Sequence, residues 1–305
     1  MRRIAAACRL SGPQCRVATL CRWQVEVQMK TVRPAPQPPR NRASTGPQPG
    51  LNRTRIVQPP HQEGPTSVSE HTPHHDAIIA LDSASLSLSS ADGMVDILRG
   101  ISLRIGAGET VGVLGPSGAG KTSLLMIMAG LESLTGGSIH LAGQDITRMG
   151  EDALAALRRD KVGIVFQAFR LIPSMTALQN VAVPLELAGR SDAADLAAEA
   201  LESVGLGHRK THLPDQMSGG EQQRVAIARA IAPRPKILLA DEPTGNLDSG
   251  TSEKVIATLF EATAAAGAAL VLVTHDAGLA ERCHRVLTIE DGQIVSDRAS
   301  AHHAA

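Results

Sequence analysis

Apolar and polar side chains alternate along two stretches after about residue 78. Residues 79–88 and 95–105 alternate in part, which is typical of strands with one buried face, and the turn residues 91–93 between them predict a hairpin. A second hairpin is predicted near the end of the chain, at 286–289 and 293–295. Shorter uninterrupted apolar runs predict buried strands, and these runs are 110–114, 162–166, 237–240 and 270–273.

Segments with helical spacing lie between these strands. In residues 193–204, for example, Ala194, Ala197, Leu201 and Val204 fall on one stripe. Strands that alternate with helices predict a parallel sheet with right-handed crossovers, so we expect an α/β fold. The other predicted helices are 121–131, 152–159, 218–231 and 253–265.

The first quarter of the chain has a different composition. Residues 1–75 hold 11 Arg and Lys against three Glu, about +8, so the remainder carries about −8. Eleven of the 18 prolines also lie there, and such a segment cannot bury enough apolar area to become ordered. We expect a disordered basic extension at 1–76, an ordered domain at 77–298 with a helical part at about 168–225, and a tail at 299–305.

Several classes of protein are excluded by what the chain lacks. No stretch approaches the roughly 20 apolar residues that cross a bilayer, so a role at a membrane would need a spanning partner. The cysteines have no metal-type CxxC spacing and suggest no disulfide framework; they are Cys8, Cys15, Cys21 and Cys283. Only its charge links the basic extension to nucleic acid, and we expect no nucleic-acid partner.

A glycine-rich loop follows the predicted strand 110–114 and precedes a helix. It matches the phosphate-loop pattern G-x-x-x-x-G-K-[ST], in which backbone N–H groups and the helix N-terminus surround phosphate oxygens. Lys121 would reach the β- and γ-phosphates of a nucleotide, and Thr122 would ligate Mg²⁺. A chance glycine-rich turn is the competing interpretation, but the strand–loop–helix context disfavours it. The loop consists of Gly115, Pro116, Ser117, Gly118, Ala119, Gly120, Lys121 and Thr122.

Two adjacent carboxylates end the apolar strand 237–240. Ligands of open α/β sheets bind at the carboxyl ends of strands, which would bring Asp241 and Glu242 beside the phosphate loop. Asp241 suits Mg²⁺ binding, and Glu242 suits activation of an attacking water. Because Pro243 follows at once, a plain helix start is the alternative interpretation.

A third motif begins the predicted helix 218–231. Ser218 and Glu221 have the spacing of a capping box, so an ordinary helix start is one interpretation. However, Gly219 and Gly220 are costly in a first helical turn. They are explained if a ligand, most simply a phosphate, must approach the backbone closely.

Together these segments resemble the ATPase domain of ABC transporters over about residues 78–298. Residues 218–222 resemble that family's signature sequence, Gln167 its Q-loop glutamine, 246–248 its D-loop, and His275 its switch histidine. The resemblance implies a phosphate-loop α/β fold with a mixed or parallel core sheet, an antiparallel hairpin subdomain and a helical subdomain.

The resemblance also implies the roles of individual residues and the partners. It implies ATP and Mg²⁺ as cofactors and a head-to-tail homodimer, in which each ATP lies between the phosphate loop of one subunit and the signature of the other. Catalysis would use Glu242, His275, Gln167 and Lys121. The metal would be held by Thr122, Gln167 and Asp241. Nucleotide would contact the phosphate loop and also Ser123, Ser218, Gly219, Gly220 and Asp248.

Finer matches indicate a subgroup. Residues 165–169, 177–181 and 241–248 are similar to lipoprotein-release, macrolide-export and cell-division ATPases, and 212–214 and 280–283 to the YbbA-like branch. This resemblance implies an FtsX/MacB-type permease as partner, and export or lipoprotein or lipid extraction at the cytoplasmic face of the bacterial inner membrane.

Two other functions are to be weighed against transport. The same subgroup includes ATPases of complexes that transmit force to periplasmic proteins without transporting anything. ABC ATPases of DNA repair, chromosome structure or translation insert long modules or carry two ATPase domains. Here Gln167 and Ser218 lie only 51 positions apart, which disfavours that class.

One departure from the family concerns the nucleotide base. Most members stack an aromatic ring, usually Tyr, on adenine, and here that position falls within 88–90, where the chain has none. Since such stacking contributes about 1–3 kcal/mol per base, we expect weak base selectivity, with similar affinities for ATP and GTP. The chain has no Tyr, and its aromatic residues are Trp23, Phe166, Phe169 and Phe260.

Overall fold

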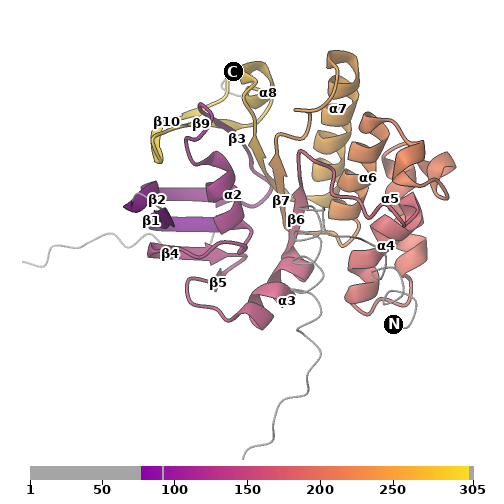
Figure 1. Cartoon of the computed structure of the whole chain (residues 1–305), viewed down its shortest axis with the longest axis horizontal. Helices are drawn as coiled ribbons and strands as arrows, with labels where there is room; N and C mark the ends of the chain where they lie inside the picture. The colour runs from indigo at the N-terminus through magenta and orange to yellow at the C-terminus, as the bar shows by residue number, and fades with distance from the viewer. Residues whose placement is uncertain (1–76, 91–92, 302–305) are drawn as a thin grey trace, which may run out of the picture.

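The computed structural model describes residues 77–90 and 93–301, which form two β-sheets with helices packed around them (Figure 1). The expected disordered extension at 1–76 lies outside these residues. The turn positions 91–92 and the last residues, 302–305, also lie outside them.

The first sheet is antiparallel and contains the predicted hairpin. Strand β1 (Ala77–Ser90) pairs with β2 (Gly93–Gly106) on one side and β4 (Gly136–Leu141) on the other, and β5 (Gln144–Asp145) adds to β4. The pattern of the sequence predicted the hairpin but neither β4 nor β5. Strand β4 opens with Gly-Gly-Ser, which carries no strand signal, and pairing with β1 supplies its conformation instead.

The second sheet is mixed and has the order β10-β9-β3-β8-β7-β6. Its five strands from β9 to β6 are parallel, and β10 pairs antiparallel with β9. The buried strands and the last hairpin expected from the sequence are all present. Their bounds are β3 (Thr110–Leu114), β6 (Val162–Val165), β7 (Ile237–Asp241), β8 (Ala269–Val273), β9 (Arg285–Glu290) and β10 (Gln293–Ala299).

Helices cover both faces of this second sheet (Figure 1). Successive side chains of β7 alternate between two separate cores: Ile237 and Leu239 join the core shared with the antiparallel sheet, whereas Leu238 and Ala240 join the core shared with α4–α7.

No helix in the described part of the chain is long and apolar enough to cross a membrane. The helices are α2 (Lys121–Met128), α3 (Glu151–Lys161), α4 (Ala177–Leu187), α5 (Ala193–Ser203), α6 (Gly219–Ile231), α7 (Ser249–Ala266) and α8 (Ala277–Ala280), with short 3-10 turns at Gly207–Arg209 and Pro214–Gln216.

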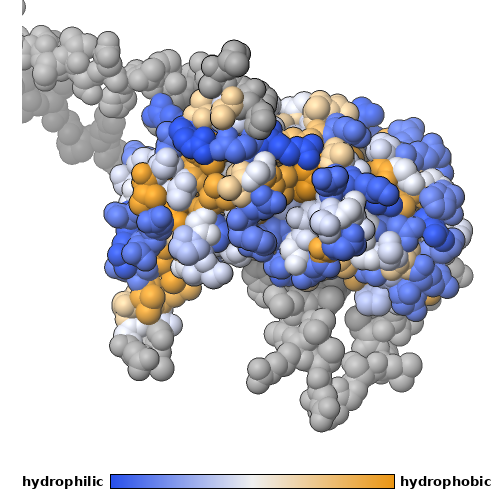
Figure 2. Space-filling model, turned by 90° about the horizontal axis from the view of Figure 1, so that it is seen from above, coloured by the Kyte–Doolittle hydropathy of each residue, from blue (hydrophilic) through white to orange (hydrophobic). Residues whose placement is uncertain are grey.

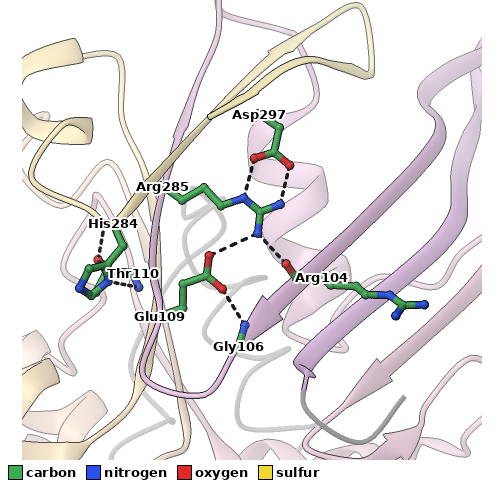
Figure 3. A network of polar contacts seen from close by, with 7 residues as sticks. All are labelled: Arg104, Gly106, Glu109, Thr110, His284, Arg285 and Asp297. Carbon is green, nitrogen blue, oxygen red and sulfur yellow. Dashed lines mark hydrogen bonds and ion pairs between the residues drawn. The ribbon is translucent and has the colours of Figure 1, made fainter. Parts of the chain in front are cut away.

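A polar network joins the two sheets at the start of β3 (Figure 3). The Arg285 guanidinium forms an ion pair with Asp297 and donates to the Arg104 carbonyl oxygen at 2.8 Å, and it also lies 3.3 Å from Glu109. Glu109 in turn accepts from the Gly106 N–H at 2.7 Å. This network fixes β2 relative to β3 and β9, and therefore fixes the strand from which the phosphate loop leaves.

Strand β6 lies so close to α6 that its second residue must be glycine. A Cβ atom on Gly163 would lie 2.5 Å from the Ala230 carbonyl oxygen. We expect Gly163→Ala to lower the free energy of unfolding by about 1–3 kcal/mol, because the helix must move away. Denaturant unfolding would measure this. The control is Gly136→Ala in β4, where the nearest atom to a new Cβ, on Ser85, is 3.7 Å away, and equal losses in the two variants would contradict the prediction.

Candidate functional site

The phosphate loop, residues 115–122, joins the end of β3 to the start of α2. Gly115 has φ 152°, and a Cβ there would lie 2.1 Å from the Ile289 carbonyl oxygen, so only glycine fits this backbone. Helix α2 begins after Gly120, which is its N-cap, and no side chain caps its first N–H groups. Those free N–H groups and the positive end of the helix dipole make the loop suitable for an anion.

Lys121 lies under this loop and is only 8 % exposed. Its Nζ donates to the carbonyl oxygens of Gly115 and Pro116, both at 2.8 Å. The ammonium group is therefore held against the inner side of the loop without a carboxylate partner among the ion pairs of the described residues. Such a cation can bind phosphate oxygens that enter the loop.

Thr122 and Asp241 meet beside the loop. The Thr122 hydroxyl lies 3.3 Å from each carboxylate oxygen of Asp241. Burial raises the pKa of Asp241, and the neighbouring charge of Glu242 adds to this, while the Thr122 hydrogen bond opposes it. A carboxylate in such surroundings is stabilised by a cation, and the hydroxyl and carboxylate oxygens of Thr122 and Asp241 are donors of the type that Mg²⁺ prefers.

Glu242, His275 and Gln167 come together at the carboxyl ends of β7, β8 and β6. Glu242 Oε2 lies 3.4 Å from His275 Nδ1, and a Cβ on Gly245 would lie 2.6 Å from Gln167 Nε2 and 3.3 Å from Glu242 Oε2. Glu242 adopts φ 42°, a strained backbone for a residue with a side chain, and strain of this kind is typical of functional sites. A carboxylate between an imidazole and an amide can accept a proton from a water placed there.

The segment after Gln167 is held by side chains from other parts of the chain. Asn246 Nδ2 donates to the Gln167 carbonyl oxygen at 3.2 Å, and Arg229 of α6 donates to the carbonyl oxygens of Phe169, at 3.0 Å, and Arg170, at 2.6 Å. Burial, and secondly the charge of Arg170, lower the pKa of Arg229 to about 10. Sequence reasoning missed Arg229 because one arginine in a helix carries no motif.

The signature segment, residues 218–222, starts α6. Ser218 is the N-cap, its Oγ accepts from the Glu221 N–H, and the Glu221 side chain accepts from the Ser218 N–H, so the expected capping box is present. A Cβ on Gly220 would lie 2.2 Å from Thr251 Cγ2 of α7. Gly220 is therefore required for helix packing within this chain, a reason that the sequence did not reveal.

The structure keeps the signature segment apart from the phosphate loop. None of the hydrogen bonds or ion pairs found within 77–90 and 93–301 joins 218–222 to 115–122. Figure 1 shows why: α2 and α6 lie on opposite faces of the second sheet. Asp248, another predicted nucleotide contact, caps α7 by accepting from the Thr251 N–H at 3.0 Å. One chain thus holds two separate groups of the predicted site residues.

Residues 88–90, where most family members have an aromatic ring that stacks on adenine, lie on the outer half of the first hairpin. Leu88, Met94 and Val95 are 43 %, 67 % and 47 % exposed, and Figure 2 shows hydrophobic residues on the projecting arm that this hairpin forms. The side chain of Ser90 is not among those described. The weak base selectivity expected from the missing ring stays a prediction.

Comparison with known proteins defines the class of this protein. Residues 98–245 match the family model described as ABC transporter. The chain is 50 % identical to a lipoprotein-releasing system ATP-binding protein, LolD, of Geobacter metallireducens over 68 % of this chain and 93 % of that protein. It is 46 % identical to the ABC transporter ATP-binding protein YbbA of Escherichia coli K12, over 71 % and 96 % of the two chains.

Two further matches extend the comparison. The chain is 47 % identical to the macrolide export ATP-binding/permease protein MacB of Rhodopirellula baltica, over 68 % of this chain and 31 % of that protein. The solved ATP-binding cassette MJ0796, a dimer bound to ADP and Pi, aligns with a TM-score of 0.68 at 37 % identity, over 72 % of this chain and 98 % of its own.

The fold and the matches identify a nucleotide-binding ATPase of the phosphate-loop class. More particularly, the chain belongs to the ABC transporter family, as an ATP-hydrolysing, ATP-binding subunit of the LolD/MacB type.

The geometry of the phosphate loop leads to a direct prediction for Lys121→Ala. We expect nucleotide affinity to fall by about a hundredfold, because the charged hydrogen bonds to phosphate disappear. Equilibrium binding of a fluorescent ATP analogue would measure this, with Lys254→Ala, an exposed lysine on α7, as the matched control. Unchanged affinity of the Lys121 variant would contradict the assignment of the loop.

Proposed function

We propose that two copies of this chain bind two ATP molecules between them in a head-to-tail dimer, and that hydrolysis of this ATP drives a membrane permease of the FtsX/MacB type. The observation that carries this proposal is the separation of the phosphate loop from the signature segment. Each of the two presents groups that favour an anion, and within one chain the core sheet stands between them.

The signature segment has the donors that a phosphate needs. The Oγ of Ser218 accepts from the Glu221 N–H, and Ser218 is exposed to solvent. A hydroxyl can accept and donate at the same time, so this one can turn its hydrogen toward a phosphate that arrives there. The positive end of the α6 dipole lies at the same place. A twofold symmetric pair brings the phosphate loop of one subunit opposite the signature segment of the other, and it does so twice.

The residues at the strand ends divide the work of hydrolysis. Glu242 accepts a proton from the attacking water, and His275, 3.4 Å from its carboxylate, orients it and can stabilise its charge. Lys121 binds the phosphate oxygens. Thr122, Asp241 and Gln167 would hold Mg²⁺, which supplies positive charge to the phosphates when bound.

Export, or extraction of a lipoprotein or lipid, is the function that we propose for this dimer; the relatives' names include lipoprotein release and macrolide export. The LolD relative is named for lipoprotein release, and the name of MacB joins ATP binding and a permease in one protein, 31 % of which is covered by this chain. We place the dimer on the cytoplasmic face of a bacterial inner membrane, held there by a separate permease. The alternative, force transmission without transport, has no support from these names.

Glu242→Gln tests the proposal most simply. We expect ATP to bind normally while hydrolysis falls by at least about a hundredfold, because the amide cannot accept the proton. ATP should then accumulate between two subunits, so light scattering after gel filtration should show a dimer with ATP and a monomer without it.

Glu261→Gln, an exposed carboxylate on α7, is the control for charge and should behave as the wild type. Wild-type turnover by the Glu242 variant would remove Glu242 from the role of base. A variant that stops hydrolysis but stays monomeric with ATP would refute the dimeric site.

A further inference from the structure

Arg209 contacts the signature segment from a neighbouring turn. It lies in the short 3-10 helix Gly207–Arg209 that follows α5, and its Nε donates to Glu221 Oε1 at 2.9 Å. Its Nη1 lies 3.1 Å from His212 Nε2, which must accept here, because a guanidinium can only donate. The guanidinium is thus fixed on two sides, with one side facing the helix that begins at Ser218.

Glu221 divides its carboxylate between two partners. Oε1 accepts from Arg209, and Oε2 accepts from the Ser218 N–H at 2.8 Å. The bond from the Ser218 backbone, followed by bonds from the Ser218 side chain and Arg209, lowers the pKa of Glu221, so this carboxylate is charged. One side chain therefore connects Arg209 to the residue proposed to donate to a γ-phosphate.

The charge of Glu221 stabilises the helix but works against the proposed ligand. A carboxylate in the first turn of a helix interacts favourably with the dipole. A phosphate that approaches the same turn is repelled by it, unless a cation compensates. The Glu221 side chain is only 16 % exposed and that of Arg209 33 %, so solvent screens this pair less than a pair on the open surface.

The turn that carries Arg209 is itself fixed to the start of α4. The N–H groups of Ala177 and Leu178, in the first turn of α4, donate to the carbonyl oxygens of His212, at 2.8 Å, and Lys210, at 3.0 Å. Arg209 is therefore held by a turn that cannot shift without leaving N–H groups of α4 unpaired. It links the first turn of α4 to the first turn of α6.

We propose that Arg209 is a positioning residue for the signature segment: it holds Glu221 in the capping box and cancels its charge, so that Ser218 can receive the γ-phosphate bound to the facing subunit. This inference rests on the head-to-tail dimer proposed above. It assigns to Arg209 an effect on ATP affinity rather than on the chemical step, since Arg209 acts through Glu221.

The Glu221→Gln variant separates this role from simple packing. Glutamine at the same position can still accept from the Ser218 N–H, and it brings no charge. If Arg209 acts by compensating that charge, removing Arg209 should weaken ATP binding when Glu221 is present and have little effect on ATP binding in the E221Q background. If Arg209 only packs against its neighbours, its removal should weaken ATP binding by the same factor in the wild-type and the E221Q backgrounds.

The experiment is a double-mutant cycle on the full-length protein, with ATP hydrolysis measured against ATP concentration. We expect R209Q to raise the ATP concentration for half-maximal rate about tenfold, with kcat reduced by less than about threefold. In the E221Q background the same substitution should raise that concentration less than about twofold. R209K keeps the charge and should raise the ATP concentration for half-maximal rate less than about threefold. It replaces R209Q in the experiment if thermal unfolding shows that R209Q folds poorly.

K210Q is the matched control, because Lys210 lies in the same turn and pairs with Glu202 at 2.7 Å, away from the signature segment. It should leave the ATP dependence unchanged. An R209Q effect of equal size with and without E221Q, or an effect on kcat alone, would overturn the inference.

The Ser218→Ala variant distinguishes an error in the proposed role of Arg209 from an error in the proposed dimeric site. If S218A abolishes hydrolysis while R209Q has no effect, only the role of Arg209 is wrong. If S218A hydrolyses ATP normally, the proposed use of the signature segment is wrong.

Discussion

The proposed dimer depends on one electrostatic constraint: a triphosphate carries more negative charge than one helix N-terminus and one lysine can neutralise. The phosphate loop supplies free N–H groups and Lys121 on one face of the core sheet. The signature segment supplies Ser218 and a second helix N-terminus on the other face. Because the sheet between them is packed on both sides, neither group can reach the other within one chain.

The segment after Gln167 is hydrogen-bonded to α6, the helix that begins at the signature segment. Arg229 of α6 holds the carbonyl oxygens that follow Gln167, and Asn246 holds the Gln167 carbonyl itself. Because Gly220 has no side chain, α6 can pack closely against α7. A change in the position of Gln167 would reach α6 through these hydrogen bonds to the backbone. In the proposed dimer, nucleotide state would be transmitted by this route to the helical part that faces a permease.

Much of this arrangement could be predicted from the sequence, because short apolar runs and three motifs carry local signals. The strands that lead to the phosphate loop and to Asp241 were predicted from the apolar runs before them. The strands β4 and β5 were not, since pairing with β1 rather than their own composition forms them. Arg209 and Arg229 were missed for a related reason: each acts on groups distant in the sequence, and only the folded chain brings them together.

The most direct test of two sites shared between subunits is complementation. Lys121→Ala and Ser218→Ala variants, each inactive alone, are mixed and ATP hydrolysis is measured. Their mixed dimer would contain one intact site, formed by the phosphate loop of the Ser218 variant and the signature segment of the Lys121 variant, so hydrolysis should return in part. Hydrolysis that stays absent in the mixture, or that persists in either variant alone, would contradict sites shared between two subunits.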